Sequence, residues 1–277
     1  MNIPDISRVT LGEMEISYRE KGVGPPLVLV HGLGGQSESW HAQFDAFSDR
    51  FRVVAWDGPG YGQSGDFSMD RPTVDDYAEL LKAFVDAIDL GHPHLVGHSF
   101  AGIVIATFNR RFSGCARSLT FLEPVIGSGK LPTEKQAELY EARRGQMEAL
   151  SPEEFADFRA RHALGPGVSP ELEAHVARVS YRVRPRGHLH AFGAMCSANI
   201  FDELAGINTP ALVVSGEHDQ TASPERCQAI ADAIPGARFT VIAGVGHVVY
   251  MEAPQEINKN LDRFLRMLEK SGFRRNG

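Results

Sequence analysis

The apolar positions of the chain form short continuous runs, separated by longer stretches with one apolar face per helical turn. Most of the short runs contain β-forming residues without polar alternation, which is typical of parallel strands buried on both faces. They predict strands at residues 16–20, 27–30, 53–55, 94–96, 119–122, 211–215 and 239–242, with an additional strand at 8–11.

Helical periodicity separates these strands. Apolar residues from Val74 to Ile88 lie on one helical face, and Thr73 is a suitable N-cap for that helix. Residues 103–108 are apolar nearly all round, which predicts a buried helix, and a C-terminal amphipathic stripe ends at Leu268. This alternation predicts an α/β fold: a doubly wound, mostly parallel eight-stranded sheet with helices on both faces.

The segment 128–203 breaks this alternation. It is rich in charge and contains no convincing strand, but Ser151-Pro152 and Ser169-Pro170 are both typical helix starts. We therefore expect a core formed by residues 1–127 and 204–277, with residues 128–203 as a helical insertion.

Composition narrows the possible partners and location. The 277 residues suffice for one full core plus an insertion. A net charge of −7 argues against nucleic acid and anionic membranes as partners, and no apolar stretch approaches the length of a membrane span. The first residues lack the pattern of a signal peptide, and residues 270–277 are expected to form a solvated tail. Cys115, Cys196 and Cys227 are odd in number and far apart, so we expect reduced thiols in the cytoplasm.

A candidate nucleophile follows the predicted strand 94–96. The stretch Gly97-His98-Ser99-Phe100-Ala101-Gly102 predicts a strand, an abrupt turn and a helix, with the serine at the apex. Such a turn requires small flanking residues and a strained serine backbone, and it places Oγ at a helix N-terminus. The pattern has glycine where this chain has Ala101, and an ordinary N-capping serine is the structural alternative.

Three further loops follow predicted strands. The strand 27–30 ends in His31-Gly32-Leu33-Gly34-Gly35, where glycines allow a backbone N–H to approach a substrate oxygen. Asp219 and His247 follow the strands 211–215 and 239–242. Because ligands bind at the carboxyl ends of parallel strands, we expect these loops to meet near Ser99.

This combination predicts acyl transfer. A serine hydroxyl needs a base, and His247 is the candidate because an imidazole titrates near neutral pH. An acid must hold that ring in the right tautomer. Asp219 is one candidate, and Glu123, which follows the strand 119–122, is the other. The backbone N–H groups of Leu33 and Phe100 are expected to bind the oxyanion.

The chain order serine, acid, histidine, together with the glycine-rich loop, resembles the α/β-hydrolase fold superfamily, in its branch of small serine esterases, lactonases and carbon–carbon bond hydrolases. The resemblance extends from about residue 27 to residue 268. It implies that Asp219 is the acid, with Glu123 as the alternative, and that residues 128–203 form a helical cap over the active site.

The resemblance implies a hydrolase that cleaves a small carboxylic ester or lactone through an acyl-enzyme. A carbon–carbon or amide bond hydrolase with the same triad is the first alternative, although His98 stands where many ring-fission hydrolases have asparagine. A ligand receptor or a cofactorless lyase or oxygenase on the same scaffold is the second. We expect no metal and no cofactor, and a monomer or homodimer. The residues expected to contact substrate are His31, Gly32, His98, Tyr140, Phe192 and Val248.

Overall fold

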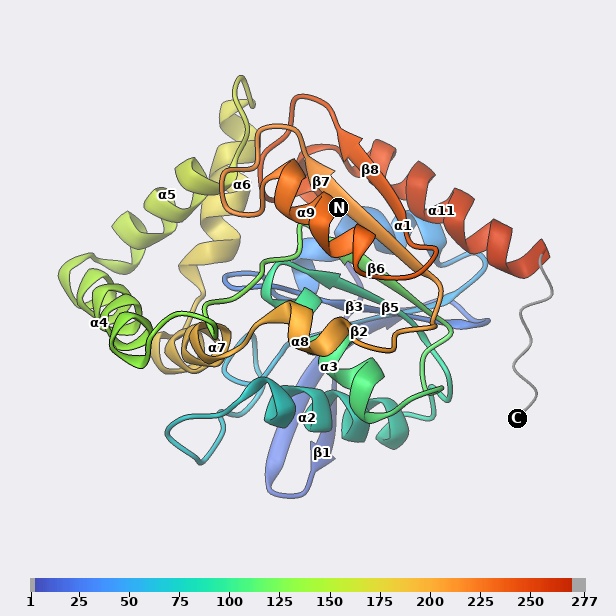
Figure 1. Cartoon of the computed structure of the whole chain (residues 1–277), viewed down its shortest axis with the longest axis horizontal. Helices are drawn as coiled ribbons and strands as arrows, with labels where there is room; N and C mark the ends of the chain where they lie inside the picture. Colours follow the sequence, from blue (N-terminus) through green and yellow to red (C-terminus); the bar gives the residue numbers. More distant parts are fainter. Residues whose placement is uncertain (1–2, 271–277) are drawn as a thin grey trace.

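The computed structural model describes residues 3–270, so the predicted solvated tail beyond residue 270 lies outside the described residues. An eight-stranded sheet forms the centre of the molecule, in the order β1-β2-β4-β3-β5-β6-β7-β8 (Figure 1). The strands are β1 (Ile6–Leu11), β2 (Met14–Lys21), β3 (Pro26–Val30), β4 (Arg52–Trp56), β5 (His94–His98), β6 (Ser118–Leu122), β7 (Ala211–Gly216) and β8 (Arg238–Ile242).

Strand β2 runs antiparallel to both of its neighbours, β1 and β4, and the remaining adjacent strands are parallel. This arrangement confirms the predicted fold class, including the additional strand at 8–11. Because β3, β5, β6, β7 and β8 are parallel, the loops that carry the candidate residues leave the sheet at one edge.

Two groups of helices cover the sheet. The helices outside the 128–203 segment are α1 (His41–Phe47), α2 (Val74–Ala87), α3 (Phe100–Arg111), α9 (Pro224–Asp232), α10 (Val249–Glu252) and α11 (Pro254–Lys270), and a short 3-10 helix spans Ser37–Trp40. Helix α8 (Ile200–Leu204) lies across the end of that segment. The cores on the two faces explain the continuous apolar runs. In β3, Val28 and Val30 pack with α2 and α3, whereas Leu27 and Leu29 pack with α1 and α11.

Local sequence signals start several helices as predicted. The Thr73 hydroxyl accepts a hydrogen bond from the Asp76 N–H, and the Asp76 carboxylate accepts one from the Thr73 N–H, which forms a capping box at α2. Ser151 forms a second capping box at α5 (Pro152–Ala163), and Ser169 caps α6 (Pro170–Tyr181) by accepting the Leu172 N–H; each serine is followed by a proline in the first turn.

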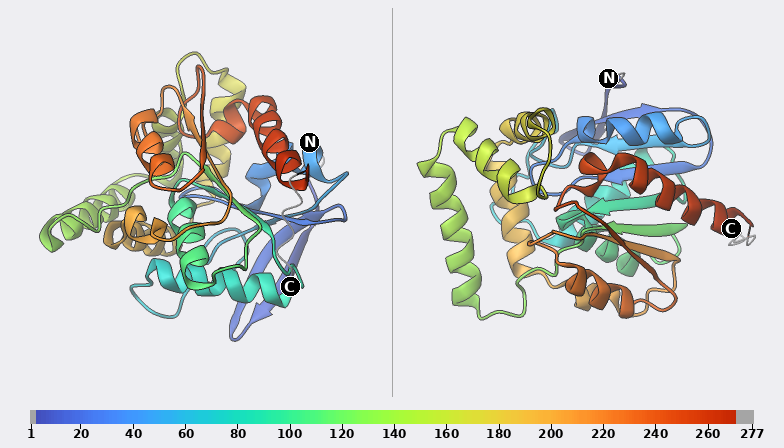
Figure 2. Two further views of the ribbon diagram at one scale, coloured as in Figure 1. Left: turned by 45° about the vertical axis from the view of Figure 1, so that its right-hand side comes forward. Right: turned by 90° about the horizontal axis from the view of Figure 1, so that it is seen from above.

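The segment between β6 and β7 is helical and lies at one end of the sheet (Figures 1 and 2). It contains α4 (Thr133–Ala149), α5 (Pro152–Ala163), α6 (Pro170–Tyr181) and α7 (Pro185–Ser197). Helix α5 packs against α6, and α4 packs against α7. The predicted boundary at residue 203 falls inside α8, which packs on α3. We call residues 128–203 the helical insertion below.

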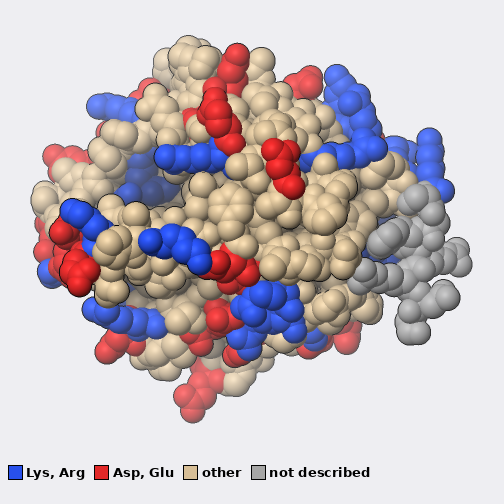
Figure 3. All heavy atoms as spheres, in the orientation of Figure 1, with Lys and Arg blue, Asp and Glu red and all other residues tan. Residues whose placement is uncertain are grey.

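The described surface carries both signs of charge. On the face shown in Figure 3, basic and acidic side chains are interspersed rather than gathered into one large patch of either sign. Among residues 3–270, no helix is long and apolar enough to cross a bilayer.

The buried His94 makes stability depend on pH. Burial is the main reason that its pKa falls from 6.5 to about 4, and Arg117 adds to the effect. Between pH 6.5 and about pH 4, His94 therefore binds a proton in the unfolded chain but stays neutral in the folded protein. The free energy of unfolding falls as the pH drops through this range.

We expect the wild type to lose about 3 kcal/mol more unfolding free energy than His94→Gln on acidification from pH 7 to pH 4. Glutamine keeps a polar partner for the Ser118 hydroxyl, which lies 2.8 Å from His94 Nδ1. Urea titrations at several pH values measure the difference, and parallel curves for the two proteins would contradict it.

Candidate active site

Ser99 occupies a strained turn between β5 and α3. Its backbone has φ 55° and ψ −117°, a conformation that side-chain-bearing residues rarely adopt. Its N–H donates to the Leu122 carbonyl on β6 at 2.9 Å, so the neighbouring strand fixes the turn. A Cβ on Gly97 would lie 2.6 Å from the Ala101 carbonyl oxygen, so glycine is required there, whereas Ala101 itself fits in the buried helix.

The serine, histidine and aspartate side chains form a continuous hydrogen-bonded chain. Ser99 Oγ lies 2.9 Å from His247 Nε2, and His247 Nδ1 lies 2.7 Å from Asp219 Oδ2. A carboxylate can only accept, so Nδ1 carries the proton and donates it to Asp219. The lone pair on Nε2 therefore faces the serine hydroxyl, which is the orientation a general base requires.

Asp219 is held as a carboxylate by its surroundings. Burial alone raises the pKa of Asp219, but the hydrogen bond and charge of His247 and the backbone N–H groups of Ala222 and Thr221 outweigh it. Those N–H groups lie 2.9 and 2.7 Å from Oδ1. The net pKa is below its usual range, so the group is ionised at neutral pH.

Glu123, the alternative acid, lies beside this chain and contacts a different histidine. Its Oε2 accepts the Val249 N–H at 3.0 Å and lies 3.3 Å from His98 Nε2. The side chain is fully buried, and burial together with the charge of Asp219 raises the pKa of Glu123 well above its usual range. The geometry thus joins His247 to Asp219.

His98 supports His247 through the backbone. Its Nε2 lies 2.7 Å from the His247 carbonyl oxygen, which can only accept, so His98 donates. Burial, and then the neighbouring His247, lowers the pKa of His98 to about 3. His98 is therefore neutral at physiological pH, and its Nε2–H is engaged by the His247 carbonyl oxygen.

His31 joins two loops below the serine. Its Nε2 accepts the Gly58 N–H at 2.9 Å, so Nδ1 carries the proton and donates to the Gly32 carbonyl at 2.8 Å. Burial lowers the pKa of His31, which keeps it neutral. This side chain orients the loop that contains Gly32 and Leu33.

The helical insertion is attached directly to the His247 loop. The His247 N–H donates to the Ala163 carbonyl at the end of α5. The Glu252 carboxylate accepts the N–H groups of Gly165, Gly246 and Val248 at 2.8–3.2 Å. Neither contact could be anticipated from the sequence, because both depend on where residues 163–165 return to the core.

A small cavity of about 30 Å³ lies next to His247. Leu33, His98 and Val248, which the sequence singles out, line it, and so does Arg159 of α5. The Arg159 guanidinium donates to the Leu33 carbonyl. Arg159 stands in a charged helix, so no sequence signal distinguished it from its exposed neighbours.

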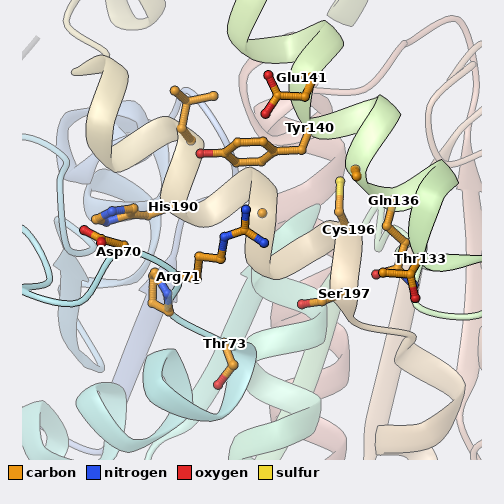
Figure 4. A pocket seen from close by; sticks show the side chains of 14 residues that line it. Asp70, Arg71, Thr73, Thr133, Gln136, Tyr140, Glu141, His190, Cys196 and Ser197 are labelled. Carbon is orange, nitrogen blue, oxygen red and sulfur yellow. The ribbon is translucent and has the colours of Figure 1, made fainter.

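Four of the predicted substrate residues do not line this cavity: His31, Gly32, Tyr140 and Phe192. Tyr140 lines a larger cavity of about 300 Å³, whose lining residues from the loop before α2, from α4 and from α7 do not include Ser99, Asp219 or His247 (Figure 4). Phe192 is buried on α7, where its ring stacks on His188 at a centroid distance of 6.4 Å. Aromatic character alone had singled out Tyr140 and Phe192.

The sequence model of the alpha/beta hydrolase fold family matches residues 25–254, which include Ser99, Asp219 and His247. The chain belongs to the alpha/beta hydrolase fold family. The match confirms the family resemblance seen in the motifs.

This alpha/beta hydrolase is similar to proteins of several activities. It is 26% identical to (E)-2-((N-methylformamido)methylene)succinate hydrolase of Acinetobacter baylyi over 90% of this chain and 93% of that protein. Among solved structures, a thermophilic esterase from Thermogutta terrifontis matches with TM-score 0.86, 24% identity and 95% and 99% coverage of the two chains. The enol-lactonase of Burkholderia xenovorans LB400 matches with TM-score 0.85, 23% identity and 94% and 100% coverage. These two structural likenesses establish the fold.

One group of side chains in this alpha/beta hydrolase has the spacing of a metal site. Among the described residues, His98, Glu123 and His247 offer ligand atoms within 4.8 Å of one another. Most polar atoms of this group are engaged: the His247 nitrogens face Ser99 and Asp219, His98 Nε2 donates to a carbonyl, and Glu123 Oε2 accepts the Val249 N–H, whereas His98 Nδ1 and Glu123 Oε1 have no partner among the described residues. The donor set therefore fits the hydrogen-bonded chain better than a cation.

The Gly32 loop lies so close to Ser99 that a side chain at residue 32 is expected to lower stability. A Cβ on Gly32 would lie 2.8 Å from both Ser99 Cβ and the His98 carbonyl oxygen, so Gly32→Ala must displace the turn. We expect Gly32→Ala to be destabilised by about 1–3 kcal/mol.

Gly145 provides the matched control. It lies within α4, and a Cβ there would meet nothing within 4 Å. Gly145→Ala is expected to be more stable than wild type by about 0.5–1 kcal/mol, because alanine loses less backbone entropy in a helix. Thermal and urea unfolding of both variants measure the effects, and equal stability of the two would refute the steric argument.

Proposed function

We propose that this protein is a serine hydrolase that cleaves a carboxylic ester or lactone of a small molecule through an acyl-enzyme. The hydrogen-bonded chain from Ser99 through His247 to Asp219 is the observation that carries the proposal. In this reading Ser99 is the nucleophile, His247 the general base and Asp219 the residue that orients the ring.

Acylation uses the tautomer described above. Nε2 of His247 takes the hydroxyl proton as Ser99 Oγ bonds to the carbonyl carbon, and the carbonyl electrons move onto oxygen. The Leu33 and Phe100 N–H groups are proposed to bind that oxyanion. When the oxyanion collapses, the carbon–oxygen bond to the leaving group breaks, and the imidazolium returns the proton to the departing alcohol oxygen.

Deacylation repeats the steps with water. His247 takes a proton from water as its oxygen attacks the acyl carbon, and the bond to Ser99 Oγ then breaks with return of the proton to the serine. Asp219 is ionised, so it can stabilise the imidazolium in both halves of the cycle. The proposal needs no metal or cofactor for either half.

The helical insertion is proposed to act as a cap. The contacts of Ala163 with His247 and of Arg159 with Leu33 support this role, because both bring the insertion over the reacting groups. A cap excludes water and shapes the pocket above the nucleophile.

Amide cleavage is the second candidate. The Acinetobacter baylyi relative is named for a formamido-bearing succinate, and the same serine, histidine and aspartate chemistry can expel an amine after protonation by the imidazolium. The two candidates differ in the scissile bond and share the nucleophile.

A substrate panel tests the proposal. We expect p-nitrophenyl esters or small lactones to be hydrolysed by the wild type, with kcat reduced at least 10³-fold in Ser99→Ala. If N-acyl compounds are cleaved and esters are not, the amide candidate replaces the ester. If binding occurs without Ser99-dependent turnover of any substrate, the hydrolase proposal is wrong.

The two candidate acids have different expected phenotypes. Asp219→Asn is expected to lower kcat about 10⁴-fold, because an amide cannot fix the tautomer or stabilise the imidazolium. Glu123→Gln is expected to retain kcat within about 10-fold, because the buried carboxyl contacts His98 and the Val249 N–H instead. Steady-state kinetics on one ester measure both, and near-normal turnover by Asp219→Asn would transfer the acid role.

A further inference from the structure

Among the described residues, four arginines of the helical insertion lack a carboxylate partner, and two of them, on α4 and α5, also have a buried guanidinium nitrogen without an acceptor. Arg143 on α4 and Arg159 on α5 form no ion pair with any of the described residues. Their neighbours on the same helices do: Arg144 pairs with Glu141 and Glu148, and Arg161 pairs with Glu173. The unpaired arginines are therefore a local exception on helices that are otherwise rich in ion pairs.

Arg159 is held against the reacting loop. Its Nη2 donates to the Leu33 carbonyl, and a Cβ on Gly34 would lie 2.7 Å from its Nε. That Nε is buried and has no hydrogen-bond acceptor within the described residues. Because Arg159 lines the same cavity as His247, its positive charge lies close to the proposed base.

Arg143 faces the same group of aromatic rings. Its guanidinium carbon lies 4.8 Å from the Phe192 ring centre and 5.9 Å from that of Phe155, while the carbon of Arg159 lies 6.0 Å from Phe155. Arg143 Nη1 is likewise buried without an acceptor. Burial, and for Arg159 also the charge of Arg143, lowers the pKa of each guanidinium, that of Arg159 to about 10. Both stay charged at neutral pH.

His188 adds a third unsatisfied group. It is fully buried on α7 between the rings of Phe155 and Phe192, and neither ring nitrogen has a partner among the described residues. Burial, followed by the charges of Arg159 and Arg143, holds the pKa of His188 well below its usual range. The neutral imidazole therefore has one N–H to donate.

The unsatisfied nitrogens of Arg143, Arg159 and His188 destabilise the protein when no ligand is bound. Burying a charge or a polar atom without a partner destabilises a protein. A negatively charged group that reached the free Arg143, Arg159 and His188 nitrogens would accept from them and reduce these penalties.

We propose that Arg143 and Arg159 bind a carboxylate of the substrate, so that the preferred substrate is a small carboxylate-bearing ester or lactone; this rests on the proposed function. A planar carboxylate matches the guanidinium fork, and the flanking Phe155 and Phe192 rings provide apolar walls for a short carbon chain. The two positive charges attract an anion locally, although the net charge of the whole chain is −7.

Paired substrates test this specificity. Mono-p-nitrophenyl glutarate is compared with its neutral methyl ester, which places the charge on the acyl part. The second pair, 4-butyryloxybenzoate and its methyl ester, places the charge on the leaving group. We expect the wild type to prefer the carboxylate form of at least one pair by 10-fold or more in kcat/KM.

Substitutions locate the preference. Arg143→Gln and Arg159→Gln are each expected to reduce the ratio at least 5-fold, whereas the matched controls Arg144→Gln and Arg161→Gln keep it unchanged. Arg159 also donates to the Leu33 carbonyl, so Arg159→Gln can lower kcat/KM for both substrates of a pair. Only loss of a contact with the substrate carboxylate changes the ratio of the two kcat/KM values. Arg159→Lys is expected to restore part of it.

The outcomes separate this inference from the proposed function. Ser99-dependent hydrolysis without a carboxylate preference, or with a preference that survives both glutamine variants, overturns the inference alone. If no substrate is cleaved, titration calorimetry with glutarate decides it: binding that is lost in Arg143→Gln and Arg159→Gln supports a carboxylate site, and absence of binding refutes it. Tighter binding of inorganic phosphate than of glutarate would show that the ligand is not a carboxylate.

Discussion

The backbone of Ser99 is the constraint on which the site depends. A residue with φ 55° at the end of β5 costs about 1–3 kcal/mol, and it persists because β6 holds the Ser99 N–H and α3 begins at the next residue. The sheet is buried on both faces, so this turn has no room to relax. The serine Oγ is therefore fixed relative to the neighbouring strand ends, and the loops after β7 and β8 need only deliver two side chains to it.

Electrostatics divides the buried groups around Ser99 into charged and neutral ones. Asp219 is stabilised as a carboxylate by two backbone N–H groups and His247, whereas burial keeps Glu123 toward its protonated form and His98 neutral. A protonated carboxyl cannot stabilise an imidazolium, which is the physical argument for Asp219 as the proposed partner. Glu123 and His98 instead hold the backbone of Val249 and His247 in place.

The sequence predicted what local pattern and strand order determine. Short runs of β-forming residues, most of them continuously apolar, predicted the eight strands. Thr73, Ser151 and Ser169 marked the starts of their helices, and the strand-end positions of Asp219 and His247 placed them at one sheet edge. Packing between distant segments could not be predicted in this manner. Arg143 and Arg159 stand near exposed arginines on charged helices, and only the fold shows that these two face the Phe155 and Phe192 rings. Tyr140 was chosen for its aromatic ring, yet the path of α4 places it at another cavity.

The size of the cavity beside His247 connects the insertion to catalysis. About 30 Å³ is far below the roughly 300–1,000 Å³ of typical ligand pockets, so on the proposed function a substrate must displace side chains of the insertion before it reaches Ser99. The arginine-rich part of the insertion is the part that such a movement would disturb, since Arg159 lies over the Leu33 loop. A carboxylate that neutralises Arg143 and Arg159 would lower the cost of keeping those charges buried. Its binding energy would then be available to hold the insertion in place around the substrate while water is excluded.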